Sequence, residues 1–159
     1  MQTYLGTPAL WCVESKTMCI LILRGPQADP AQLLPMQLPE CAGRALRTLV
    51  CADVDSLIAG LQAAGGDAEV ELVLLDSGDL SPSAHAHAKA LRAALDALPT
   101  PYIELHADAA QELEPWLHPQ HAPLAVVITP HDASRAYAMS LGIAARCLPS
   151  LCAPLRVAA

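Results

Sequence analysis

A glutamate and a histidine separated by one residue, Glu104 and His106, have the best spacing in this sequence for acting together chemically. They lie in P-Y-I-E-L-H-A-D, from Pro101 to Asp108, a segment with the pattern of a short buried β-strand. Because side chains alternate between the two faces of a strand, Tyr102, Glu104 and His106 share one face. Open α/β sheets bind ligands beyond the carboxyl ends of their strands, so the pair marks a place for chemistry. From these residues alone, a structural hydrogen bond is as good an interpretation as a functional one.

Polar residues also follow other predicted strands of the chain. Since the carboxyl ends of parallel strands meet at one edge of a sheet, several of these residues are expected to converge on one rim. In chain order they are Arg24, Gln27, Asp76, Ser77, Asp79, Asp108, His131 and Asp132. For Arg24, a salt bridge to Asp76 or Asp79 is favoured over a role in holding an anion.

The sequence contains no established cofactor or metal motif. It lacks a G-x-G-x-x-G, a G-x-x-x-x-G-K and a G-x-S-x-G, so dinucleotide, nucleotide triphosphate and α/β-hydrolase sites are not indicated. His85 and His87 are two residues apart on a predicted helix and point in different directions, which favours a solvated face. The other histidines lie in or near loops, and a metal site built from them is the less favoured alternative: His118, His121 and His131 with Asp132. We therefore expect neither a metal nor a cofactor.

Composition narrows the class of protein. The chain has 159 residues, of which 53% are hydrophobic and 16% charged, as expected of one compact domain. The net charge is −7, and the nine Lys and Arg residues do not cluster, which argues against nucleic acid and anionic membranes as partners. The six cysteines include no C-x-x-C pair and lie mostly in apolar runs, as buried reduced thiols do. No signal-peptide pattern and no membrane-length apolar run appear, so we predict a cytoplasmic protein.

The elements that would position the polar residues alternate between strand and helix. Apolar runs predict strands over 18–23, 46–51, 70–75, 101–108 and 124–128. Helices are predicted from Asp53 to about 65, from Ser81 to about 98, over 109–117, and from Asp132 to about 145. This alternation implies an α/β fold, a five-stranded parallel sheet with helices on both faces. We expect an N-terminal arm over 1–17, one domain over 18–148, a mainly loop segment over 27–43, and a C-terminal tail over 149–159.

Three strand ends resemble motifs of the type II 3-dehydroquinate dehydratases, or type II dehydroquinases. The segment I-L-R-G-P-Q (22–27) is similar to the family's I-L-N-G-P-N, and L-L-D-S-G-D-L-S-P-S-A (74–84) keeps the frame of its I-x-N-x-G-x-x-T-H-T-S. The segment E-L-H-A-D (104–108) is similar to its E-V-H-x-S-N. The resemblance covers roughly residues 19–145, and it implies a flavodoxin-like three-layer sandwich and assembly into trimers or dodecamers.

The resemblance also implies roles for particular residues. His106 matches the family's general acid and Glu104 the carboxylate that orients it, while Gln27 stands at the position of an enolate-stabilising Asn. Ligand-binding positions carry over to Gln27, Arg24, Asp76, Ser77, Ala107 and Asp108, and the expected ligand is a small carboxylic-acid metabolite.

The family's base is a Tyr activated by an Arg on the loop after the first strand, and this chain departs from that pattern. It has no Tyr between Tyr4 and Tyr102 and no Arg between Arg24 and Arg44. We therefore predict a dehydroquinase-like protein with a degenerate active site, a noncatalytic paralogue that binds a metabolite or supports assembly. The alternative is an active dehydratase, or a related hydro-lyase on a small hydroxylated acid, with His106 as general acid.

Overall fold

The computed structural model describes residues 17–26, 40–80, 84–130 and 132–149. Within these ranges, six strands form one sheet in the order β2-β3-β1-β4-β5-β6. The strands are β1 (Cys19–Arg24), β2 (Glu40–Cys41), β3 (Arg44–Val50), β4 (Val70–Asp76), β5 (Tyr102–His106) and β6 (Ala125–Ile128). The helices are α1 (Val54–Gly66), α2 (Ala84–Ala97), the short 3-10 helix η1 (Ala109–Gln111), α3 (Glu114–Leu117) and α4 (Ala133–Cys147).

Five of the strands are parallel to one another, and β2 alone is antiparallel, paired to β3. Numbered along the chain without β2, the five parallel strands have the order 2-1-3-4-5, which is the flavodoxin-like order. The predicted α/β class and the five-stranded parallel sheet are confirmed.

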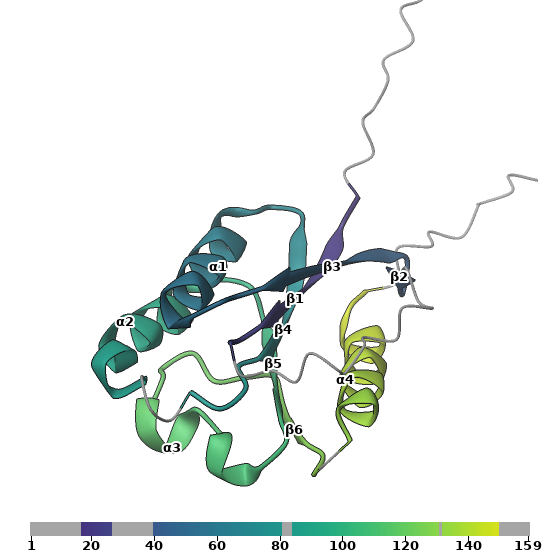
Figure 1. Cartoon of the computed structure of the whole chain (residues 1–159). Helices are drawn as coiled ribbons and strands as arrows, with labels where there is room; N and C mark the ends of the chain where they lie inside the picture. Colours follow the sequence, from purple (N-terminus) through teal and green to yellow (C-terminus); the bar gives the residue numbers. More distant parts are fainter. Residues whose placement is uncertain (1–16, 27–39, 81–83, 131, 150–159) are drawn as a thin grey trace, which may run out of the picture.

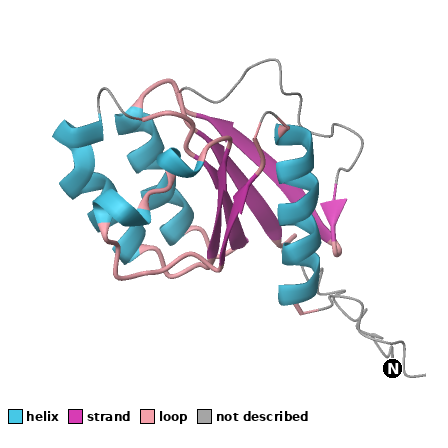
Figure 2. Ribbon diagram, turned by 90° about the horizontal axis from the view of Figure 1, so that it is seen from below, coloured by secondary structure: helices cyan, strands magenta, loops and turns pink. Residues whose placement is uncertain are grey.

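Helices cover both faces of the sheet. Figures 1 and 2 show α1, α2 and α3 together on one side and α4 on the other. Strand alternation supplies each face with its own apolar core, because odd and even residues of one strand point to opposite sides. We call the side under α1, α2 and α3 the first face and the side under α4 the second face. Leu21, Leu23 and Leu75 pack on the first face, whereas Ile22 and Leu74 pack on the second.

Local sequence signals explain where α1 begins. The Asp53 side chain accepts the N–H of Ser56, and the Ser56 hydroxyl in turn accepts the N–H of Asp53. This reciprocal pair is a capping box, which satisfies backbone donors that the first turn of a helix leaves free. The buried stripe of α1 includes Val54, Leu57 and Leu61, at the helical spacing that predicted it.

Two predicted elements differ from the structure. The segment 27–43 was expected to be mainly loop, but Glu40 and Cys41 form β2 in a tight hairpin with β3. The single helix expected over 109–117 is two short pieces, because Glu112 is extended between them with a ψ of 136°. Pro115 has no N–H to donate to residue 111, so a continuous helix could not run through it.

The four described cysteines are free, but only Cys19 and Cys51 are buried as predicted, whereas Cys41 is half-buried and Cys147 is exposed. Cys19 and Cys51 are buried in the core of the first face, and desolvation by burial raises the pKa of both thiols. The predicted N-terminal arm and C-terminal tail lie almost entirely outside the described residues, as does the segment 27–39. In the described part of the chain, no helix combines the length and the apolar character needed to cross a membrane.

Candidate functional site

The Glu104 and His106 side chains contact each other at the carboxyl end of β5. Glu104 Oε2 lies 2.8 Å from His106 Nε2, and the exposed fractions of the two side chains are 1% and 0%. Tyr102, two residues before Glu104, belongs to the core of the first face, and Glu104 is in register with Leu75 of that same core. The predicted shared face and the predicted pairing are therefore confirmed, and the pair is sealed from solvent.

The segment that follows β5 also contacts the Glu104 carboxylate. The backbone N–H of Leu113 donates to Glu104 Oε2 at 3.4 Å, so one oxygen faces two groups. Asp108, one of the predicted ligand positions, caps η1 by accepting the N–H of Ala110 at 2.9 Å. The N–H of Ala107 donates to the side chain of Gln111 at 3.2 Å. Both contacts stabilise the local conformation of the segment that follows β5.

Arg24 and Asp76 form a second group, at the ends of β1 and β4. Arg24 Nε lies 3.7 Å from Asp76 Oδ2, which is the salt bridge that the sequence favoured. The hydroxyl of Tyr137, near the start of α4, donates to the same Oδ2 at 2.5 Å. Sequence reasoning missed Tyr137, although α4 follows β6 and therefore starts at the rim where the strands end.

The two groups lie at the same rim of the sheet, where the parallel strands end, as expected, but on opposite faces of the sheet. Arg24 and Asp76 are partners in register, and the side chain that reaches them comes from α4 on the second face. Glu104 and His106 lie on the first face, under η1 and α3. The alternation of side chains along β4 decides this, because Leu75 is in register with Glu104 and Asp76 follows Leu75 by one residue, so Asp76 points to the other face.

Ser77 and Gly25 bring the ends of β1 and β4 close together. The N–H of Gly25 donates to the carbonyl of Asp76 at 2.6 Å, and Ser77 is fully buried. A Cβ added to Gly25 would lie 2.1 Å from the carbonyl oxygen of Ser77, so only glycine fits there. Gln27, another predicted ligand position, lies outside the described residues.

Tyr137 lies beside Arg24, but its surroundings favour the protonated phenol, whereas a catalytic base must lose its proton. Burial, followed by the adjacent Asp76 carboxylate, raises the pKa of the Tyr137 phenol far above its usual value. The Arg24 charge acts in the opposite direction without offsetting these effects. Tyr137 is therefore held protonated, as a donor that ties α4 to the strand ends.

Tyr102 is held in the same protonation state by a different contact. Its hydroxyl donates to the carbonyl of His121 at 2.8 Å, and the His121 ring lies edge-on to it, with centroids 5.2 Å apart. Burial raises the pKa of the Tyr102 phenol well above its usual value. Within the described ranges, no three His, Cys, Asp or Glu side chains are grouped to hold a metal, and His131 lies outside them.

These two phenols predict an alkaline limit to stability. The folded state keeps them protonated at a pH where the unfolded chain releases those protons, so their contribution is complete below about pH 10 and declines above it. In a titration followed by tyrosinate absorbance, Tyr102 and Tyr137 should ionise only as circular dichroism reports unfolding. Ionisation of both at about pH 10 in the folded protein would contradict this.

Replacement of Tyr137 by phenylalanine is expected to lower the free energy of unfolding by about 1.5 kcal/mol, because a hydrogen bond to a charged group is lost. Chemical denaturation near neutral pH measures this. A matched Tyr102→Phe variant, whose lost acceptor is an uncharged carbonyl, should lose about 1 kcal/mol. No loss in Tyr137→Phe would show that the contact with Asp76 contributes nothing.

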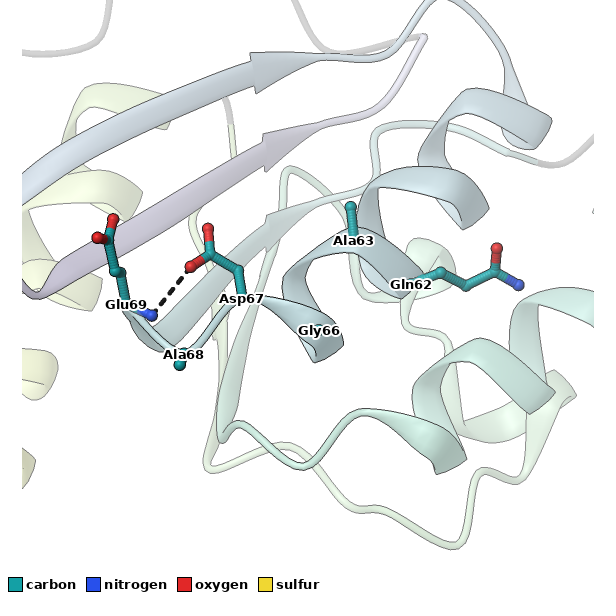
Figure 3. Close-up of a pocket in the computed structure, with 6 residues that line it drawn as sticks. All are labelled: Gln62, Ala63, Gly66, Asp67, Ala68 and Glu69. Carbon is teal, nitrogen blue, oxygen red and sulfur yellow. Dashed lines mark hydrogen bonds between the residues drawn. The ribbon is translucent and has the colours of Figure 1, made fainter.

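A hollow of about 530 Å³ lies at the other end of the strands (Figure 3). It is lined by Gln62, Ala63, Gly66, Asp67, Ala68 and Glu69, where α1 ends and β4 begins. The Asp67 carboxylate is occupied there, since it accepts the N–H of Glu69 at 2.9 Å and contacts Arg47 at 2.6 Å. The hollow lies at the opposite end of the strands from Glu104 and His106, and its two carboxylates, Asp67 and Glu69, already pair with Arg47.

No known protein family and no curated protein matches the chain. Among solved structures, it is similar to the crystal structure of type II dehydroquinase from Propionibacterium acnes, with 17% sequence identity and a TM-score of 0.49. The alignment covers 83% of this chain and 97% of that chain. A likeness at this level does not assign a reaction or a site residue to this chain.

Proposed function

We propose that this protein is a noncatalytic relative of the type II dehydroquinases, in which Glu104 and His106 serve the fold and any ligand is bound without being dehydrated. The burial of His106 is the observation that carries the proposal. Its side chain has no exposed surface, and its Nε2 faces Glu104 rather than a space open to solutes. A general acid must reach within hydrogen-bond distance of the atom it protonates.

The base side of the reaction supports the same proposal. The segment 27–43 contains neither Tyr nor Arg, and the tyrosine that lies beside Arg24 has a raised pKa. A positioned base typically contributes 10²–10⁴-fold to a rate, and a base must be deprotonated at the working pH. Tyr137 is also on the opposite face from His106, so the two side chains do not flank a shared substrate.

One observation favours the second candidate, an active hydro-lyase on a small hydroxylated carboxylic acid with His106 as acid. Among the described residues, His106 Nδ1 and Glu104 Oε1 are buried and have no hydrogen-bond partner. Leaving a polar atom in that state costs about 1–3 kcal/mol, so a water or a ligand oxygen there would be stabilising. This candidate requires the segment over β5 to open during the reaction.

Turnover of 3-dehydroquinate separates the two candidates. We expect purified protein to form no conjugated enone above the rate of the buffer, and the His106→Ala variant to be indistinguishable from wild type. Steady enone formation that His106→Ala abolishes would overturn the noncatalytic proposal. The Tyr137→Phe variant, measured alongside, reports whether the only described tyrosine near Arg24 contributes to any activity found.

Thermal denaturation with 3-dehydroquinate and shikimate distinguishes a metabolite-binding protein from one retained for assembly. A ligand at about 100 times its Kd stabilises the folded state by about 2.7 kcal/mol. For a site at the β5 end, that stabilisation should be lost in Glu104→Gln, which keeps the volume of the side chain. The absence of any shift for wild type would leave assembly, in trimers or dodecamers, as the proposed role.

A further inference from the structure

The outer edge of β3 is open over most of its length. In the described part of the chain, its only partner on that edge is β2, which pairs with Arg44 and Ala45 and stops. Residues 47–50 are exposed, including Leu49 at 42% and Val50 at 69%. Such an edge, apolar and without a pairing strand, is a template for another strand.

The sequence disfavours an extension of β2 along β3. Ala42 and Gly43 have φ values of 51° and 78°, as in a two-residue type I′ hairpin turn. In that hairpin, Cys41 and Arg44 form a hydrogen-bonded pair, whereas the next pair, Glu40 and Ala45, is not hydrogen-bonded. The pair after it would again be hydrogen-bonded, and it would join Leu46 to residue 39. The residue required to donate to Leu46 would be Pro39, which has no N–H.

Alternation fixes which backbone groups β3 presents outward. The N–H of Ala45 donates to Met18 and that of Cys51 to Arg24, so the odd-numbered residues face β1. The N–H and C=O groups of Leu46, Thr48 and Val50 therefore point away from the sheet. These are three donor and acceptor pairs at the spacing of an antiparallel ladder.

We propose that this edge pairs with β3 of a second copy of the chain, antiparallel and across a two-fold axis at Thr48. In this register Thr48 faces Thr48, and Leu46 faces Val50 of the other copy in both directions. The hydrogen-bonding groups of the two edges coincide, because the paired residues all belong to the outward-facing set. The two sheets then form one continuous sheet through a self-complementary contact.

Charge favours this register over its neighbour. Residues 46–50 contain no acidic side chain, so the net charge of −7 is not concentrated at the contact. Their one charged residue, Arg47, contacts Asp67 at 2.6 Å and Glu69 at 3.4 Å within its own copy. About Thr48, Arg47 faces Leu49, whereas a shift that centres the axis on Arg47 would place two like charges opposite each other.

Light scattering on wild type and on charge variants at Thr48 tests the proposal. Wild type should have at least twice the chain mass of 16.7 kDa. Thr48→Lys and Thr48→Glu each place like charges across the axis, so each should have at most half the wild-type mass. An equal mixture of the two variants should regain the wild-type mass, because opposite charges then face each other.

Two further variants keep the test decisive. Met139→Lys adds the same charge at an exposed position on α4 and should keep the wild-type mass. Val50→Lys replaces Thr48→Lys if that variant does not fold, as judged by circular dichroism. A wild type of 16.7 kDa at all concentrations, or an oligomer whose mass the Thr48 and Val50 variants leave unchanged, would overturn the proposal.

Discussion

Replacement of Glu104 by alanine is expected to lower the free energy of unfolding by about 3 kcal/mol. Glu104 is fully buried, and its Oε2 faces both His106 Nε2 and the N–H of Leu113. Truncation leaves two buried polar groups without their acceptor and adds a cavity. Against a typical total of 5–15 kcal/mol, this loss is a large part of the stability.

Urea denaturation of a small set of variants measures this effect and assigns it to the pair. Glu104→Gln keeps the volume and one acceptor oxygen, and should lose about 1 kcal/mol. The double variant Glu104→Leu with His106→Leu removes both partners. Its free energy of unfolding should fall by less than that of Glu104→Ala, because neither member of the pair is left buried without its partner. A loss below about 1 kcal/mol for Glu104→Ala would contradict a structural role for the carboxylate.

Replacement of Gly25 by alanine is expected to cost about 3 kcal/mol for a different reason. The added methyl group would lie 2.1 Å from the Ser77 carbonyl oxygen and 2.7 Å from its carbonyl carbon. Both atoms belong to the backbone immediately after β4, so the ends of β1 and β4 must separate to make room. The hydrogen bond from the Gly25 N–H to Asp76 would be strained by the same movement.

Gly142→Ala is the matched control for Gly25→Ala. Gly142 lies inside α4, and an added Cβ there meets no atom within 4 Å. Alanine in a helix interior is favoured over glycine by about 1 kcal/mol, so this variant should be more stable than wild type. If both variants changed the midpoint of thermal denaturation by the same amount, the close approach of Gly25 to Ser77 would not be the cause.

The parts of the fold that could be predicted are those with a strong periodic signal. The apolar runs of β1 and β4 and the spaced leucines of α1 correspond to the structure because burial imposes those patterns directly. The two-residue strand β2 left no such pattern. It depends on the tight turn at Ala42 and Gly43 and on the place of Pro39, and both act through backbone geometry.

The candidate site was predictable pair by pair but not as a whole. The Glu104 and His106 contact follows from a spacing of two on one strand, and the Arg24 salt bridge from adjacent strand ends. Their separation on opposite faces depended on the register between strands, since Leu75 pairs with Glu104 while Asp76 points the other way. Tyr137 comes from a helix 61 residues after Asp76, and no local pattern joins the two.

The burial of His106 carries the proposal of a noncatalytic protein, and chemical modification of histidines tests that burial most directly. The folded protein would be treated with diethylpyrocarbonate and the modified residues located by peptide mass spectrometry. We predict that the exposed His118 reacts while His106 stays unmodified, and that His106 reacts once the chain is unfolded in urea. Modification of His106 in the folded protein at the rate of His118 would contradict the account, because an imidazole that a small reagent reaches is also one that a substrate can reach.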